Sequence, residues 1–259
     1  MSYMKNRKSG NAKRDTWIVI IFLIVVVAVI AALIWFFASP KQEQSVKTET
    51  TAAAEQDIAE MPFDVPGFTM LQDAPCGRLN DYFYVSCMGS YSGMFFEDGL
   101  DEPVENVLAI VVKNISSELV EYGVITADCG GETATFELSG LPVGSSVLVL
   151  EKNRMPAGEE CRTLSCMQYA LPGNLVMDFG SDFTVYPSDG VINIENISGE
   201  DINGDVFLFY KNFEYGLFIG GITYRARFTG GIKAGDIAQC LQQHYYGDTS
   251  AILYMSYAK

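Results

Sequence analysis

The stretch Ile110-Val-Val-Lys-Asn-Ile-Ser116 recurs as Ile192-Asn-Ile-Glu-Asn-Ile-Ser198, at an offset of 82 residues. Apolar side chains occupy alternate positions in both copies, and a period of two places them on one buried face of a β-strand. Each copy ends at Asn-Ile-Ser, which is a turn signal, and a second alternating run follows it. The sequence therefore predicts strand–turn–strand units, and it predicts them twice.

A second pair of landmarks lies further along each copy. Gly140-Leu-Pro-Val-Gly144 resembles Gly231-Ile-Lys-Ala-Gly235 at an offset of 91 residues, and an apolar run follows each of them. Because the two offsets differ by nine, the second copy carries about nine extra residues, which we place near Lys211–Gly221.

Short apolar runs separated by Gly, Asn or Asp continue to the end of the chain, and no convincing amphipathic helix follows Glu60. Two copies of about 75–90 residues each predict a mainly β fold with two tandem antiparallel, immunoglobulin-like β-sandwich domains, 61–180 and 181–259. One larger sandwich folded from both halves is the alternative. Candidate strands in the first copy are Tyr82–Ser86, Gly93–Glu97, Val107–Lys113, Glu121–Ala127, Thr133–Leu138, Val147–Leu150 and Leu175–Phe179.

This pattern, over at most the two repeats, resembles the small immunoglobulin-like or FxLYD-like β-sandwich modules of membrane-anchored surface proteins from Gram-positive-type bacteria. The resemblance rests on residues 192–198, on Val206-Phe-Leu-Phe-Tyr210 and on the later Gly-x-x-x-Gly turn. The aromatic-x-Leu-Tyr-Asp core of that family is represented by Phe207-Leu-Phe-Tyr-Lys211, with Lys211 in the Asp position. The resemblance implies a binding or spacer module, and it brings no catalytic residues.

An uncharged apolar run from Trp17 to Ala38 precedes the β-rich part. A helix of that length, at about 1.5 Å per residue, crosses a hydrocarbon core of about 30 Å. Basic residues dominate the preceding segment, so the positive-inside rule places the N-terminus in the cytoplasm and the later residues outside the cell. A cleaved signal peptide is the alternative, although its apolar region usually has about 7–15 residues. The predicted segments are a cytoplasmic basic tail (1–15), a transmembrane helix (16–38) that contacts the lipid bilayer through residues 17–38, and a polar stalk (39–60).

The chain has 259 residues and a formal net charge of −15. Five basic residues and one acidic residue lie before the apolar run, so 12 basic and 31 acidic residues remain and the predicted extracellular part has a net charge of −19. Such a surface repels nucleic acid, and we predict no nucleic-acid partner.

Six Cys residues allow 15 disulfide connectivities. An oxidising compartment favours disulfides, and the local candidates are Cys76–Cys87 and Cys161–Cys166.

The sequence carries no motif for catalysis, a cofactor or a metal. His244 is the one His, and no Cys-x2-Cys, Gly-x-Ser-x-Gly or His-Glu-x-x-His is found. Asp201-Ile-Asn-Gly-Asp205 resembles the start of a calcium loop, but Val206 and Asn212 stand where that loop needs Gly and Glu. We therefore predict no catalytic residue, no cofactor and no metal. A membrane-anchored extracellular hydrolase that uses surface carboxylates is the alternative, because two such acids can meet only in space.

Aromatic residues in the loops give the better indication of partner binding. Phe213, Tyr215 and Phe218 fall in the extra stretch of the second copy, and Tyr245 and Tyr246 fall in the last long loop. Exposed aromatic side chains on a rigid scaffold are common contact residues, and packing in the core is the alternative. The sequence thus predicts a non-catalytic, membrane-anchored extracellular binding or spacer module for a protein or polymer partner.

Overall fold

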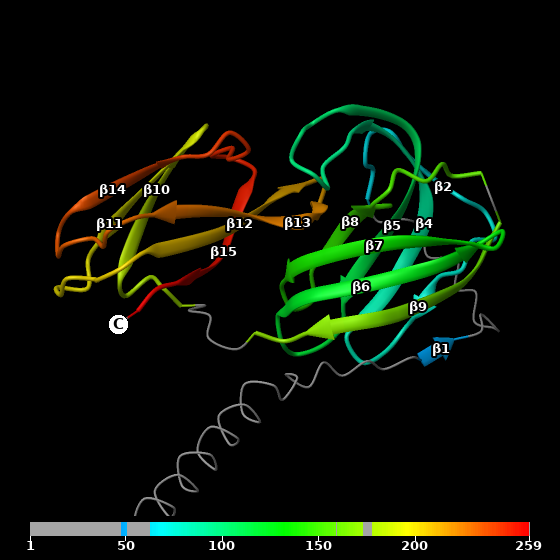
Figure 1. Cartoon of the computed structure of the whole chain (residues 1–259), viewed down its shortest axis with the longest axis horizontal. Helices are drawn as coiled ribbons and strands as arrows, with labels where there is room; N and C mark the ends of the chain where they lie inside the picture. The colour runs from blue at the N-terminus through cyan, green and yellow to red at the C-terminus, as the bar shows by residue number, and fades with distance from the viewer. Residues whose placement is uncertain (1–47, 51–62, 159, 173–177, 259) are drawn as a thin grey trace, which may run out of the picture. The chain divides into compact units, whose positions relative to one another are not determined.

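The computed structural model describes residues 48–50, 63–158, 160–172 and 178–258 (Figure 1). These residues form strands, turns and loops without any helix, so the predicted mainly β fold class is confirmed. The strands are β1 (Thr48–Thr50), β2 (Phe68–Met70), β3 (Gly77–Arg78), β4 (Phe83–Met94), β5 (Pro103–Asn114), β6 (Val120–Cys129), β7 (Glu132–Leu141), β8 (Ser146–Leu150), β9 (Cys161–Ala170), β10 (Phe183–Ser188), β11 (Val191–Asn196), β12 (Val206–Glu214), β13 (Leu217–Phe228), β14 (Ile237–Leu241) and β15 (Ser250–Ser256).

The predicted cytoplasmic tail (1–15) and transmembrane helix (16–38) lie outside the described residues. Within the described part of the chain, no helix has the length and apolar character needed to cross a bilayer. Of the predicted stalk (39–60), the structure describes only β1, which pairs in antiparallel register with β9. The transmembrane assignment therefore stays a prediction.

The first copy of the repeat, coloured cyan to green in Figure 1, packs two sets of paired strands around its core. One set contains β4, β5 and β8, and the other contains β9, β6 and β7. Leu108, Ile110 and Val112 of β5 face this core and are at most 1% exposed. The residues between them are buried in a different apolar cluster. Burial on both faces explains why β5 has a nearly continuous apolar run.

The second copy, coloured yellow to red in Figure 1, repeats these strand pairings. The three strands β10, β11 and β14 pair in that order, and β13, β12 and β15 also pair in order. Ile192 and Ile194 of β11 and Leu208 of β12 are fully buried in a separate core. The period-two alternation of the sequence thus corresponds to sandwich-like packing in both copies.

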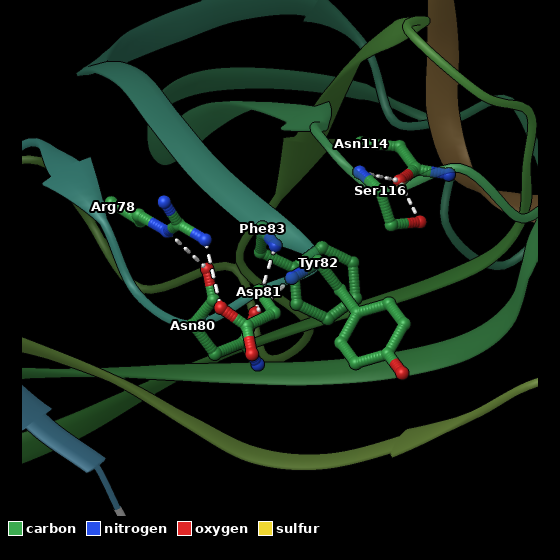
Figure 2. A network of polar contacts seen from close by, with 7 residues as sticks. All are labelled: Arg78, Asn80, Asp81, Tyr82, Phe83, Asn114 and Ser116. Carbon is green, nitrogen blue, oxygen red and sulfur yellow. Dashed lines mark hydrogen bonds and ion pairs between the residues drawn. The ribbon is translucent and has the colours of Figure 1, made fainter.

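The Asn-Ile-Ser turn of the first copy is built around the buried side chain of Asn114 (Figure 2). Its Nδ2 donates hydrogen bonds to the carbonyl oxygens of Glu118 (2.8 Å) and Leu141 (2.9 Å). Its Oδ1 accepts hydrogen bonds from the backbone N–H (2.9 Å) and the hydroxyl (2.8 Å) of Ser116. The side-chain amide therefore connects the end of β5 to the end of β7.

A disulfide joins Cys129 of β6 to Cys161 of β9, so disulfide bonding outside the predicted membrane segment is confirmed. The predicted local pairs Cys161–Cys166 and Cys76–Cys87 are wrong. Cys161 and Cys166 lie on one extended strand, about 16 Å apart at ~3.3 Å per residue, which is too far for a disulfide. Cys76 is an exposed thiol, whereas Cys87 packs in an apolar cluster. Cys129 and Cys161 are directly opposite each other in the strand register.

The extra residues of the second copy fall between Asn196 and Ile232, a segment that contains the hairpin β12–β13. Asn196 and its hydrogen-bond partner Ile232 are 36 residues apart, whereas Asn114 and Leu141 are 27 apart, a difference of nine. The start of the longer β13 pairs in parallel with β8 of the first copy. This pairing joins strands of both copies in the order β15-β12-β13-β8-β5-β4-β2. We call residues 211–221 the hairpin end.

Candidate functional site

The hairpin end is fixed to the first copy by the fully buried side chain of Lys211. Its Nζ donates hydrogen bonds to the carbonyl oxygens of Gly221 (2.7 Å), Ile222 (2.7 Å) and Ser139 (3.1 Å). Three acceptors match the three protons of an ammonium group. The side chain of Lys211 therefore holds the hairpin end against β7.

Glu97, from the loop between β4 and β5, completes this network. Its Oε1 accepts a hydrogen bond from the backbone N–H of Leu150 (2.8 Å), and its Oε2 accepts one from Gly221 (2.7 Å). Burial raises the pKa of Glu97 and lowers the pKa of Lys211, while the attraction between the two groups opposes both shifts. Because N–H donors stabilise the carboxylate and carbonyl oxygens stabilise the ammonium, we assign both groups as charged.

Two glycines allow the close approach of the hairpin end to the first copy. A Cβ atom added at Gly221 would overlap the carbonyl oxygen of Glu137. Gly220 has a φ of +84°, and a Cβ atom there would lie 2.9 Å from the Cβ of Phe96. A side chain at either position would therefore separate the hairpin end from the first copy.

A pocket of about 510 Å³ opens where the hairpin end meets the β4–β5 loop and the β14–β15 loop. This volume lies within the range of small-molecule sites, about 300–1,000 Å³. Among the residues that line it are aromatic rings, two carboxylates and an imidazole, and the described lining includes no Lys or Arg. We call it the hairpin pocket. Its aromatic and titratable lining residues are Tyr91, Phe96, Tyr215, Tyr224, Tyr246, Asp101, Glu214 and His244.

Tyr215 reaches the hairpin pocket from a turn that does not favour a bulky residue. Glu214 pairs with Leu217, so Tyr215 and Gly216 form a two-residue loop with φ values of 53° and 84°. Positive φ at both central residues is the requirement of a type I′ turn, which prefers Asn-Gly or Gly-Gly. The equivalent turn of the first copy is Gly130-Gly131. Tyr215 therefore adopts a backbone conformation that a bulky residue does not favour.

Tyr246 is held near the hairpin end by hydrogen bonds between the β14–β15 loop and β12. The backbone N–H of Phe213 donates to the carbonyl oxygen of Thr249 (2.7 Å), and the Ser250 hydroxyl donates to Oδ1 of Asn212 (2.7 Å). The backbone N–H of Tyr246 in turn donates to Oγ of Ser250 (2.9 Å). These contacts fix the loop that carries Tyr246 to the strand that leads to Tyr215.

His244 contributes an imidazole that is already engaged on two sides. Its ring stacks on Tyr224 with 5.0 Å between centroids, and Tyr224 also stacks on Tyr210. Its Nδ1 lies 3.1 Å from Oδ2 of Asp101. Burial raises the pKa of Tyr224, and the nearby carboxylates of Asp101 and Glu97 raise it further. Asp101 and Glu97 therefore lie close enough to Tyr224 to disfavour loss of its phenol proton.

The five aromatic residues predicted to contact a partner occupy different settings. Tyr215 and Tyr246 line the hairpin pocket and are 49% and 44% exposed. Phe213 is 43% exposed on the hairpin, outside the pocket lining, and its ring contacts Phe218. Phe218 and Tyr245 are buried in the two cores, at 5% and 1% exposed. Partner binding stays a prediction, and the pocket brings together Tyr215 and Tyr246 only.

The stretch that resembles a calcium loop has its carboxylates engaged in the fold. Asp205 accepts hydrogen bonds from Nε of Arg227 (2.8 Å) and from the backbone N–H of Gly230 (3.2 Å), and the Arg227 bond lowers the pKa of Asp205. Asp201 accepts one from the backbone N–H of Ala234 (3.0 Å). No group of three His, Cys, Asp or Glu side chains in the described ranges could hold a metal ion.

Sequence reasoning did not identify Asp101, Glu214 and Tyr224 as members of one site. They come from the β4–β5 loop, the end of β12 and the middle of β13, so only the fold brings them together.

Comparison with known proteins found no matching family model, no matching curated protein and no matching solved structure. The function is therefore argued from the hairpin pocket and from the sequence.

Proposed function

We propose that this protein is a single-pass, membrane-anchored extracellular module whose tandem immunoglobulin-like β-sandwich domains (61–180 and 181–259) bind a ligand without transforming it. The hairpin pocket is the observation that carries the proposal, because it combines exposed aromatic rings with the carboxylate of Glu214, unpaired among the described residues, in a cavity of ligand size. It uses loops of both copies, so the repeat and its longer hairpin are needed to build it.

The extracellular location is supported by the apolar run 17–38 with its basic leader and by the disulfide between Cys129 and Cys161. Disulfides form and persist mainly in oxidising compartments. The acidic surface also suits a protein that does not associate with anionic polymers.

A binding role fits the hairpin pocket better than a hydrolase does. Nucleophilic catalysis needs a hydroxyl or thiol hydrogen-bonded to a base. Among the described residues, His244 contacts Asp101 and Tyr224, and no hydroxyl or thiol is hydrogen-bonded to its ring. Several surface carboxylates are engaged in ion pairs, such as Glu137 with Lys152 and Asp98 with Arg154.

Membrane topology is tested with the exposed thiol of Cys76, which no other Cys precedes in the sequence. A membrane-impermeant maleimide added to intact cells that express the full chain is expected to modify Cys76, with the modified peptide identified by mass spectrometry. The variant Cys76→Ser is the matched control and loses that peptide signal. Labelling that requires permeabilised cells would place the β-rich part in the cytoplasm and overturn the proposal.

A further inference from the structure

We propose that the hairpin pocket binds a small organic cation of the alkylammonium class, held between the carboxylate of Glu214 and the rings of Tyr215 and Tyr246. This inference rests on the proposed binding function and names its ligand class. Three independent features of the pocket support it: the charge of its lining, the uncovered aromatic rings and its size.

The carboxylate of Glu214 lacks a positive partner. It lines the pocket on the last residue of β12, and it makes no hydrogen bond or ion pair with any residue that the structure describes. In the neighbouring β4–β5 loop, by contrast, Asp98 and Glu102 both pair with Arg154 at 2.9 Å. Asp101 adds a second carboxylate to the lining, at His244. The unneutralised charge of this pocket therefore favours a positive ligand.

Two rings of the pocket are uncovered. Tyr215 and Tyr246 are nearly half exposed, and neither stacks on another ring or carries a cation among the described residues. The fold covers other rings with guanidinium groups, as Arg154 covers Phe95 at 4.5 Å from the ring centroid. The negative face of an aromatic ring attracts an ammonium group. The lining thus offers both elements of an ammonium site, an aromatic surface and a carboxylate.

The size of the pocket suits a small molecule. Its volume of about 510 Å³ lies within the range of small-molecule sites, about 300–1,000 Å³. The Tyr215 ring enters from the type I′ turn with φ of 53°. That conformation has a local cost, which contact between the Tyr215 ring and a bound ligand would offset.

The test compares choline with its neutral isostere 3,3-dimethylbutan-1-ol by isothermal titration calorimetry. The full chain is held in nanodiscs of phosphatidylglycerol, whose headgroup contains no ammonium. We expect choline to bind more tightly than the isostere by about tenfold or more, because only the cation gains from the carboxylate and the ring faces.

The variant Glu214→Gln is expected to remove most of this difference in affinity, and Tyr215→Asn is expected to weaken choline binding. Phe213→Ala, an exposed ring on the same hairpin outside the pocket, should leave it unchanged.

Equal binding of choline and the isostere would overturn the cation inference while leaving a ligand-binding pocket in place. Tighter binding of neutral N-acetylglucosamine, or of tetralysine, would likewise replace the small cation with a sugar or a basic peptide. Absence of binding by all four probes would also overturn the inference. An equal loss of choline affinity in Phe213→Ala and Tyr215→Asn would contradict the proposed site itself. The experiment therefore distinguishes a wrong ligand class from a wrong binding site.

Discussion

Asn196 makes in the second copy the same set of hydrogen bonds that Asn114 makes in the first. Its Nδ2 donates to the carbonyl oxygens of Glu200 (2.8 Å) and Ile232 (2.8 Å), and its Oδ1 accepts from the backbone N–H of Ser198 (3.1 Å). Both Asn side chains are fully buried. The repeated Asn-Ile-Ser is thus a structural turn in which both the nitrogen and the oxygen of the Asn side chain have hydrogen-bond partners.

We predict that Asn114→Ala and Asn196→Ala each lower the free energy of unfolding by about 1–3 kcal/mol, because each leaves buried carbonyl oxygens without a donor. Urea unfolding of the full chain in detergent, followed by circular dichroism, measures this loss. The neighbouring variants Ile115→Ala and Ile197→Ala are matched controls, since these side chains are 37% and 46% exposed. A loss no larger than that of the controls would mean that the Asn network does not stabilise the turns.

Tyr215→Asn is predicted to stabilise the fold by about 1 kcal/mol, because Asn adopts positive φ in a type I′ turn more readily than Tyr. The same variant should lose ligand affinity, so stability and binding change in opposite directions. Tyr215→Phe, which keeps the ring, should show no stabilisation. Thermal unfolding without ligand measures the effect, and a destabilised Tyr215→Asn would show that the ring contributes more to folding than to binding.

Glu97 and Lys211 are predicted to make stability depend on pH. Burial holds the pKa of Glu97 above its usual 4.5. The contribution of Glu97 to the free energy of unfolding is therefore full below pH 4.5 and is lost as the pH rises through the raised pKa. Burial holds the pKa of Lys211 below its usual 10.5, so its contribution is full above pH 10.5 and is lost as the pH falls through the lowered pKa. Both groups therefore reduce stability most between these pH values.

The double variant Glu97→Gln/Lys211→Met removes both titrations and is the comparison that isolates them. The free energy of unfolding of the wild type minus that of this variant should pass through a minimum between pH 4.5 and 10.5. Lys211→Met alone should cost about 3–5 kcal/mol, because it leaves a buried carboxylate without its cation. A pH-independent difference would show that the two groups keep their ordinary pKa values in the fold.

The disulfide Cys129–Cys161 is predicted to contribute about 2–4 kcal/mol to stability. Reduction of the wild type should lower the urea midpoint. The double variant Cys129→Ala/Cys161→Ala should show a similar decrease without reductant. Cys76→Ser, which changes an exposed thiol, is the control and should unfold like the wild type. If reductant also destabilises the double variant, a different disulfide carries the effect.

The strands with clear alternation could be predicted from the sequence, and irregular ones could not. The expected strand Val107–Lys113 lies within β5, and the run Glu121–Ala127 lies within β6. No strand was expected at β9, whose pairing with β6 is interrupted by two register shifts. Such shifts disturb the period of two, so Cys161–Ala170 does not alternate regularly between buried and exposed positions. The disulfide partner of Cys161 depends on this register, so it could not be predicted from the sequence either.

The aromatic residues of the candidate site could be proposed from sequence only as a group. Tyr245 and Tyr246 are neighbours, yet Tyr245 packs in the core of the second copy and Tyr246 lines the pocket. Which one turns inward depends on how the β14–β15 loop bonds to β12, a contact between segments that are distant in sequence. The sequence therefore indicated the loops of the site, and the fold selected the side chains.

The central claim is that Tyr215 and Tyr246 share one ligand pocket at the hairpin end. Fluorine NMR of the full chain labelled with 3-fluorotyrosine tests it, with resonances assigned from Tyr→Phe variants. On titration with choline, the account predicts shifts of the Tyr215 and Tyr246 resonances with one common dissociation constant. Tyr186, 45% exposed on β10 and outside the pocket lining, should not move. Equal shifts at Tyr186, or no shift at Tyr215 and Tyr246, would contradict the account.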